Sequence, residues 1–354
     1  MTLKEIAAEL NVSPSIISRV LNGYTQSFSI TDELRQRILK KVEECGYRPN
    51  PVFSAIKQKK NKQISILYYS PSPKSTGLTM DDMIDEASLF FQENNYFVNF
   101  SFSSRSDSKR FLYQLPLWKV SGLLIPDNHE KEALAAVENA GIPYVCMNGI
   151  AAGKGVSVLC DEEDGMKQIL EKFHNSGHRK ICLVQQKMLK SEKNFYTIGG
   201  ERRKAFFHYC TEMGMEASLL EHQPSRGSKE RFQEQVYLQD SAPLLELIQK
   251  GITAFICESS LCPELYYRIH QIGKRIPEDL SIIAYNNESV LRWLFPPVTV
   301  FEIPARAMGK LAAELLLRKI SGDLEYDNGK THLLKGKLIC RESVATVSRT
   351  DENK

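Results

Sequence analysis

The stretch TLKEIAAELNVSPSIISRVLNG, residues 2–23, decides the fold of the amino-terminal part of this chain. Apolar residues at helical spacing predict two short amphipathic helices, Leu3–Leu10 and about Ser15–Asn22, separated by the turn NVSP. The apolar side chains that would lock these helices at a fixed angle are Ile6, Leu10, Val12, Ile17, Val20 and Leu21. The stretch therefore predicts a helix-turn-helix, and two helices of an unrelated α-helical core are the alternative interpretation.

The residues of the turn favour the helix-turn-helix. Asn11 stands where the turn needs a positive φ, which Asn tolerates better than other non-glycine residues. Ser13 is placed to cap the second helix, and Pro14 then falls in its first turn, where a missing N–H costs nothing. This arrangement leaves several side chains of the second helix facing outward, namely Ser15, Ser18, Arg19 and Asn22.

The charge of the first 62 residues indicates contact with nucleic acid. This segment holds eleven Lys and Arg residues and six acids, so its net charge is +5. The whole chain carries +3, so residues 63–354 carry −2. A small basic unit attached to a mildly acidic body is typical of a protein whose amino-terminal part alone touches phosphates.

The remainder of the chain is long and apolar enough to bury two or three cores, since 42% of the 354 residues are hydrophobic. No run approaches eighteen consecutive apolar residues and the chain begins directly with the helix-turn-helix, so we expect a cytoplasmic protein without membrane insertion or export. The eight cysteines show no CxxC spacing, which favours buried thiols over disulfides. The seven histidines do not cluster, and no metal or cofactor is predicted.

Beyond the basic segment, apolar β-branched runs alternate with helical patterns. A helix is expected over Ile30–Glu44, begun by Thr31. The expected strands are Ile64–Tyr69, Phe97–Phe102, Gly122–Ile125, Tyr144–Met147, Val156–Leu159, Ile181–Gln185, Ala254–Cys257 and Leu280–Tyr285. The helical patterns between them are Asp82–Asn94, Glu130–Asn139, Asp164–Asn175, Gly200–Met213, Pro243–Gln249, Pro263–Gln271 and Ala305–Ile320. This alternation predicts two doubly wound parallel α/β lobes with a ligand cleft at the carboxyl ends of the strands.

Five segments together resemble the LacI/GalR family of transcriptional regulators. They are the helix-turn-helix, GYRPNP, residues 160–184, ERRKAFFHY at 201–209 and IPEDLSIIAYNN at 276–287. The resemblance runs from Thr2 to about Val344 and implies a homodimer with a headpiece (1–49), a hinge helix and linker (50–62) and a two-lobed core (63–345) resembling periplasmic sugar-binding proteins. It places one lobe at about 63–160 and 290–320, the other at about 161–289 and 321–345, and a polar tail at 346–354.

The resemblance also assigns the DNA contacts. Pro14, Ser15 and Arg19 occupy the positions that enter the major groove, where an arginine grips guanine through two hydrogen bonds. A phosphate clamp or a structural ion pair is the alternative role for Arg19. The residues suited to phosphates are Thr2, Ser13, Ser18 and Asn22.

Residues 50–57 resemble the family's hinge helix, which follows Asn50 and reads the minor groove. Ile56 stands where the family inserts an apolar wedge that kinks the duplex, and Lys57 would face phosphates. Phe53 replaces the small residue usual in the family, which leaves its own minor-groove contact open. Packing of this segment on the core is the alternative.

The resemblance places an effector site at six residues, Tyr69, Ser70, Asn148, Arg202, Glu258 and Asn286. Arg202 matches the family's ligand-binding arginine, with structural pairing as its alternative. Asn148 and Asn286 stand where sugar-responsive members carry aspartates, and ordinary turn residues at strand ends are an equal alternative. We expect a small polar, sugar-like effector.

The resemblance implies a repressor of carbohydrate-utilisation genes that binds a pseudo-palindromic operator and is coupled allosterically to its effector. Since no GxGxxG, GxxxxGK[ST], GxSxG or HExxH motif occurs, no enzymatic activity is expected. A regulator that senses a protein partner or no ligand, and a headpiece fused to a phosphosugar enzyme, are the alternatives. The short polar tail favours a dimer over a coiled-coil tetramer.

Overall fold

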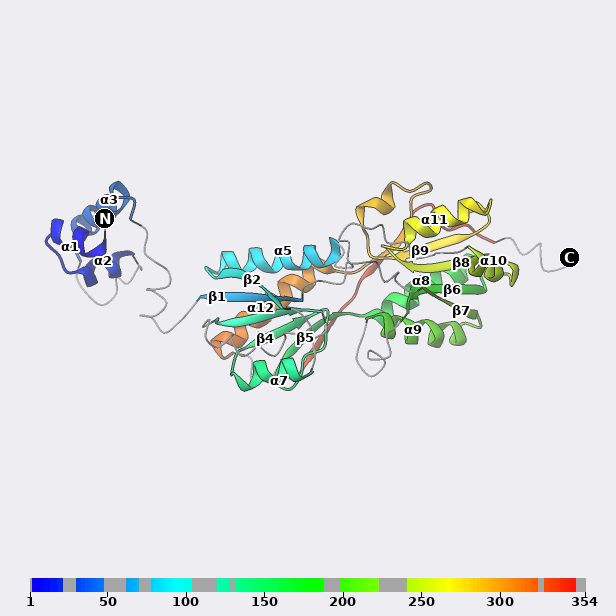
Figure 1. Ribbon diagram of the computed structural model, residues 1–354, viewed down its shortest axis with the longest axis horizontal. Coiled ribbons are helices and arrows are strands. Elements are labelled where there is room, and N and C mark those ends of the chain that lie inside the picture. Colours follow the sequence, from blue (N-terminus) through cyan, green and yellow to red (C-terminus); the bar gives the residue numbers. More distant parts are fainter. Residues whose placement is uncertain are drawn as a thin grey trace. The chain divides into compact units, whose positions relative to one another are not determined.

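The computed structural model describes residues 2–21, 30–47, 62–69, 78–103, 120–127, 131–187, 198–222, 241–323 and 328–347. Contacts between residues divide the chain into two compact units, Met1–Lys62 and Gln63–Lys354 (Figure 1). Among the helices within these ranges, none is long and apolar enough to cross a membrane.

The first unit contains three helices, α1 (Leu3–Glu9), α2 (Pro14–Leu21) and α3 (Asp32–Glu44). Its centre is a cluster of buried apolar side chains, Ile6, Ala7, Ile17, Val20 and Ile38. Thr2 and Glu5 form a reciprocal capping box at the start of α1. These local signals confirm the predicted helix-turn-helix.

Two further predictions about the first unit are confirmed. Asn11 has a φ of 53°, as the turn between α1 and α2 requires. The Thr31 hydroxyl accepts a hydrogen bond from the Leu34 N–H and so begins α3.

The second unit is built on two six-stranded sheets. The first has the order β11-β5-β4-β3-β1-β2, and all its strand pairs are parallel. Its strands are β1 (Gln63–Tyr69), β2 (Phe97–Ser103), β3 (Gly122–Pro126), β4 (Tyr144–Met147), β5 (Val156–Cys160) and β11 (Thr331–Leu334). Helices α5 (Leu78–Glu93) and α12 (Ala305–Ser321) pack on one face, and α7 (Lys131–Asn139) packs on the other.

The second sheet has the order β12-β10-β9-β8-β6-β7, and only β12 runs antiparallel to its neighbour. Its strands are β6 (Lys180–Gln186), β7 (Glu216–His222), β8 (Ala254–Glu258), β9 (Ser281–Tyr285), β10 (Thr299–Glu302) and β12 (Lys337–Ile339). Helices α8 (Glu162–Asn175) and α9 (Ile198–Glu212) cover one face. The other face carries α10 (Ala242–Gln249) and α11 (Cys262–Gln271), and the short helix η3 (Ser289–Arg292) follows β9.

The fold agrees with the predicted doubly wound α/β class, but two lobe boundaries were wrong. The return to the first lobe, expected near residue 290, occurs between β10 and α12, because Thr299–Glu302 pairs with β9 of the second sheet. The final crossing, expected near 321, occurs between β11 and β12, because Thr331–Leu334 pairs with β5 of the first sheet. Local sequence patterns do not show which sheet a strand joins, since pairing is a long-range contact.

The cysteines behave as expected. All eight are free, and six of them are buried: Cys146, Cys160, Cys182, Cys210, Cys257 and Cys262. Burial raises the pKa of the Cys182 thiol to about 12, which keeps it protonated and unreactive at neutral pH.

The end of the described chain is fastened to the second sheet through His178. This side chain is 3% exposed, and its Nε2 lies 3.1 Å from the Ala345 carbonyl oxygen, which can only accept a hydrogen bond. Nε2 therefore donates, and Nδ1 accepts from the Thr253 hydroxyl at 2.8 Å. The neutral ring thus has a partner for each nitrogen.

We expect stability to fall as the pH drops through the titration range of His178. Burial, aided by the charge of Arg179, lowers the pKa of His178 to about 4 despite the hydrogen bond to Ala345, against an ordinary 6.5. Between these values the unfolded state binds the proton more readily, so this contribution is present above pH 6.5 and lost as the pH approaches 4. The loss at pH 4.5 is roughly 2–3 kcal/mol relative to pH 7. Urea unfolding of the wild type and His178→Gln at both pH values measures this loss, and His208→Gln, at an exposed position, is the control. If all three proteins show the same pH dependence of stability, His178 is not its source.

Candidate functional site

The exposed side of α2 carries the predicted DNA-reading residues. Pro14, Ser15 and Arg19 are all exposed, while the opposite side of the helix buries Ile17 and Val20. The Ser13 and Ser15 hydroxyl oxygens lie 2.8 Å apart at the start of the helix, and Thr2 is exposed beside α1. Ser18 is half-buried. The packing of the three helices therefore presents the start of α2 and Arg19 on one accessible surface.

Several predicted site residues lie outside the described residues. These are Asn22, Asn50, Phe53, Ile56 and Lys57 of the DNA-binding set and Ser70 of the effector set. Tyr69 is the last residue of β1, but its side chain also lies outside the described part of the chain.

At the carboxyl edge of the second sheet, the structure brings Arg202 and Glu258 close enough to interact electrostatically. Arg202 lies near the start of α9, and Glu258 is the last residue of β8. Burial raises the pKa of Glu258, and the charge of Arg202 opposes that rise. Asn286 follows β9 directly at the same edge, with a φ of 67°.

A buried ion pair holds the Arg202 side chain. Its Nε donates to Glu162 Oε2 at 2.7 Å, and its second bond reaches Glu162 Oε1 at 3.2 Å. The guanidinium also stacks on the Tyr285 ring, 3.9 Å from the ring centre. Burial acts to lower the pKa of Arg202, but the Glu162 carboxylate holds it above its ordinary value. The structure thus shows the pairing that the sequence left as the alternative to ligand contact.

Asn148 follows β4 at the carboxyl edge of the first sheet. Its Nδ2 donates to Asp127 Oδ1 at 3.2 Å, and both residues have positive φ, 64° and 61°. Burial raises the pKa of Asp127, while the hydrogen bond from Asn148 lowers it. Asn148 and Asn286 therefore both serve the turns that follow their strands.

Sequence reasoning missed three residues of this edge: Glu162, Gln185 and Tyr285. Gln185 is 4% exposed, and neither of its amide atoms has a hydrogen-bond partner within the described ranges. Its signal was visible, because a glutamine closes the otherwise apolar run ICLV. Glu162 follows the helix cap Asp161 in the run DEED, which gave no sign of which acid is buried.

A separate cavity of about 230 Å³ lies between α5 and the ends of β9 and β10. Asn287, which lines it, donates to Glu302 at 2.6 Å and accepts from Arg341 at 2.5 Å. Arg306 on the same wall pairs with Asp82 at 3.3 Å. These polar groups of the cavity therefore already have protein partners.

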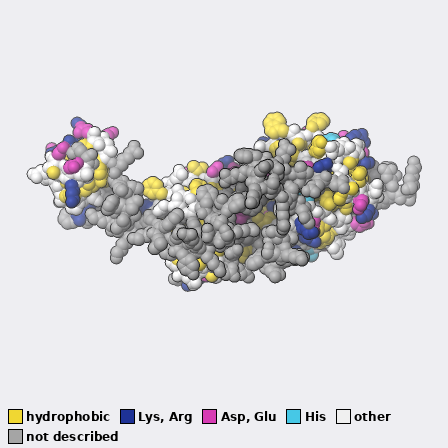
Figure 2. Space-filling view, viewed as in Figure 1, with side chains coloured by type: hydrophobic (Ala, Val, Ile, Leu, Met, Phe, Trp, Pro, Cys, Tyr) yellow, Lys and Arg dark blue, Asp and Glu magenta, His cyan; other side chains and the backbone are white. Residues whose placement is uncertain are grey.

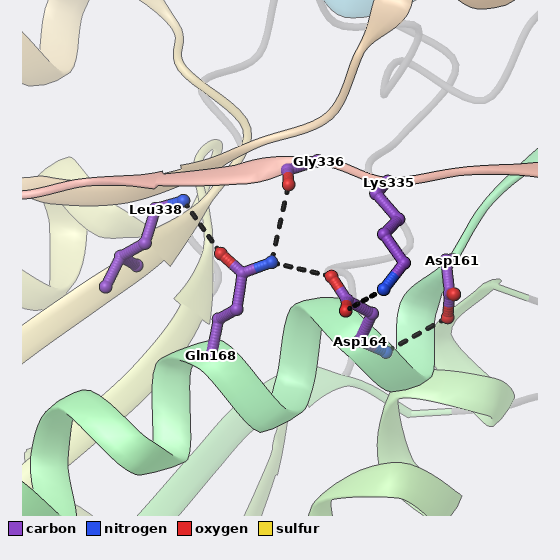
Figure 3. Close-up of polar contacts among 6 residues, drawn as sticks. All are labelled: Asp161, Asp164, Gln168, Lys335, Gly336 and Leu338. Carbon is purple, nitrogen blue, oxygen red and sulfur yellow. Dashed lines mark hydrogen bonds and ion pairs between the residues drawn. The ribbon is translucent and has the colours of Figure 1, made fainter.

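Helix α8 also contacts the segment of the last crossing between the sheets, as Figure 3 shows. Its first turn holds Glu162 and also Asp164, which pairs with Lys335 Nζ at 2.9 Å. One turn later Gln168 donates to the Gly336 carbonyl at 3.3 Å and accepts from the Leu338 N–H at 3.1 Å. One rigid helix therefore contacts both the buried arginine and the segment that joins β11 to β12.

Similarity to known proteins covers both units. Residues 2–50 match the family described as bacterial regulatory proteins, lacI family, and residues 170–344 match the periplasmic binding protein-like domain. The chain is 26% identical to the ribose operon repressor of Haemophilus influenzae over 97% of this chain and 98% of that protein. It is 23% identical to the HTH-type transcriptional repressor PurR of Vibrio vulnificus over 98% and 99%.

Solved structures show the same fold. A lac repressor dimer bound to operator and the anti-inducer ONPF matches with a TM-score of 0.77 at 20% identity, covering 98% of this chain and 99% of that one. A ribose-bound LacI family regulator from Enterococcus faecium matches with a TM-score of 0.65 at 20% identity, covering 81% and 100%. The helix-turn-helix, the paired α/β sheets and these matches show that the chain joins a lacI-family regulatory domain to a periplasmic binding protein-like domain.

Proposed function

We propose that this protein is a cytoplasmic repressor that binds a two-fold symmetric operator as a homodimer. Its affinity for the operator changes when a small polar effector binds. The observation that carries the DNA-binding part is the exposed start of α2, with Arg19 on the surface of a helix-turn-helix. The relatives named as a ribose operon repressor and the ribose-bound regulator support a sugar or sugar derivative as effector.

Exposed aromatic side chains between β9 and β10 support dimerisation. Trp293 and Phe295 are 85% and 87% exposed, and Val290 beside them is 43% exposed. Figure 2 shows hydrophobic side chains protruding from the surface over this segment. Large exposed aromatic residues are enriched where proteins associate. We assign a second copy of the chain as their partner, in keeping with the dimer named for the lac repressor structure.

Replacement of Trp293 and Phe295 by alanine is expected to weaken the dimer. Buried aromatic anchors contribute about 2 kcal/mol or more each, so loss of both should raise the dissociation constant of the dimer by about 1000-fold or more. Analytical ultracentrifugation at micromolar concentration measures this change. Phe97→Ala, at an exposed position on β2, is the control and should leave the dimer intact. A double variant that stays as dimeric as the wild type places the interface elsewhere.

Coupling between effector and operator would pass through α8, which contacts both Arg202 and the segment that joins β11 to β12. An effector can shift the operator affinity only by its different affinities for the two conformations, commonly about 1–3 kcal/mol or 5–150-fold. Operator titration with and without saturating effector tests this step. An effector that binds and leaves operator affinity unchanged would refute the coupling. A protein that binds no operator specifically, either with or without effector, would refute the repressor function.

A further inference from the structure

A row of polar side chains crosses the carboxyl edge of the second sheet on its α8/α9 side. In β6, Ile181, Leu183 and Gln185 alternate onto one face, and the first two pack in the core with α8 and α9. Tyr285 packs in the same core, and it pairs with Glu258 in the register of β8 and β9. Since Val184 pairs with Cys257, the next step along both strands sets Gln185 beside Glu258.

These polar groups lack protein partners. Gln185 and Tyr285 are 4% and 1% exposed, yet the amide nitrogen and oxygen and the tyrosine hydroxyl form no hydrogen bond with any described residue. The Asn286 Oδ1 at the same edge is also buried without a partner. Each unsatisfied buried group costs about 1–3 kcal/mol. Four such atoms on one edge indicate a site that a bound molecule completes.

The charge of Arg202 is already balanced within the protein. Its Nε and one terminal nitrogen donate to Glu162, and its flat face is covered by the Tyr285 ring. Glu258, half-buried, adds a second carboxylate to the same group. The group thus contains two carboxylates, Glu162 and Glu258, and one guanidinium. An anionic ligand would therefore be repelled, whereas a hydrogen-bond donor could bind to the carboxylate oxygens.

We propose that the effector is an uncharged or amine-bearing molecule rich in hydrogen-bond donors, a polyol or amino sugar, recognised by Gln185, Glu258 and Tyr285, and that Arg202 positions Tyr285 and does not itself hold an anionic group. This inference rests on the proposed function and specifies the ligand class of the same site. Phosphorylated and carboxylated sugars are excluded from it by the two glutamates. Burial raises the pKa of Glu258, and a ligand donor that reaches its carboxylate would oppose that rise by stabilising the charged form.

The first arm of the test needs no known ligand. In Gln185→Leu an unpartnered buried amide is replaced by an apolar group of similar size, so the melting temperature of the ligand-free protein should rise by several degrees. Gln186→Leu, at the exposed next residue of β6, is the matched control and should change it little. A fall in the melting temperature of Gln185→Leu would show that Gln185 has structural partners and would overturn the site.

The second arm compares matched probes by thermal shift and calorimetry on full-length protein. Ribose, glucose, glucosamine and galactosamine are each paired with their phosphorylated forms at millimolar concentration. We expect at least one unphosphorylated probe to bind, its phosphorylated form to bind on the order of tenfold more weakly or worse, and Glu258→Gln to narrow that difference. If a phosphorylated form binds more strongly, or if no unphosphorylated probe binds, the proposed class of effector is wrong.

Operator binding by the same preparations separates the two proposals. If specific DNA binding persists while the probes fail, the ligand class is wrong and the repressor function stands. If specific DNA binding is absent in wild-type protein, the proposed function itself fails. Gln186→Leu, outside the proposed site, should bind operator as the wild type does in the absence of ligand.

Discussion

Arg19→Ala is expected to abolish most of the specific operator affinity while leaving binding to unrelated DNA nearly intact. Arg19 is exposed in the last turn of α2, where a guanidinium can donate two hydrogen bonds to one guanine. A good pair of this kind is worth about 1–3 kcal/mol, and a dimer uses it twice, so the loss is about 2–6 kcal/mol, or roughly 30-fold to more than 10⁴-fold. Fluorescence anisotropy with operator and with random duplex measures both affinities.

The control for this substitution is Arg37→Ala, which removes the same charge from an exposed position on α3. It should weaken specific and non-specific binding to a similar, small extent, because a general change in charge acts through phosphates alone. If Arg19→Ala also weakens both kinds of binding equally, Arg19 is a phosphate clamp and does not read a base.

Glu162→Ala is expected to give the largest loss of stability of any single substitution discussed in this protein. It leaves the Arg202 guanidinium buried and unpaired, since the side chains of this pair are only 9% and 5% exposed. Removing one partner of such a pair costs about 3–5 kcal/mol, a large fraction of the 5–15 kcal/mol that typically stabilises a folded protein. Urea unfolding followed by circular dichroism measures the change.

The neighbouring pair provides a matched control. Arg203 and Glu221 are also 2.7 Å apart, but their side chains are 37% and 29% exposed, so Glu221→Ala should cost no more than about 1 kcal/mol. The double variant Glu162→Leu with Arg202→Met should recover most of the lost stability, because it removes both buried charges. Equal, small losses for Glu162→Ala and Glu221→Ala would show that Arg202 does not depend on Glu162.

The three helices of the first unit could be predicted nearly to the residue because their signals are local. Asn11 at the turn, Pro14 at the start of α2 and Thr31 before α3 each act on neighbouring backbone groups, and the structure places each where the sequence indicated. The second helix begins one residue earlier than predicted, at Pro14. Local capping determines such boundaries, and tertiary packing then fixes the angle between the helices.

Four strands of the second unit escaped prediction for a physical reason. The run EASLLEH of β7 carries two glutamates and a histidine, and it becomes a strand by pairing with β6 at the sheet edge. Strands β10, β11 and β12 have only three or four residues each. Short strands and edge strands owe their conformation to a neighbour distant in sequence, which periodicity does not reveal.

The candidate site was predictable in position but not in its pairing. The resemblance placed Arg202 and Glu258 at the site, and the structure brings them together. Glu162 lies 40 residues before Arg202, and their contact arises only when α8 packs against α9. The sequence therefore could locate the arginine but not show that a glutamate already binds it.

The proposed repressor reads a two-fold symmetric DNA sequence through α2. Selection of bound duplexes from a random library by full-length protein, followed by sequencing, tests this reading. Two copies of one half-site in inverted orientation at a fixed spacing are predicted, each with a guanine position whose preference disappears in Arg19→Ala. An asymmetric single motif, or no enrichment over the starting library, would contradict the account.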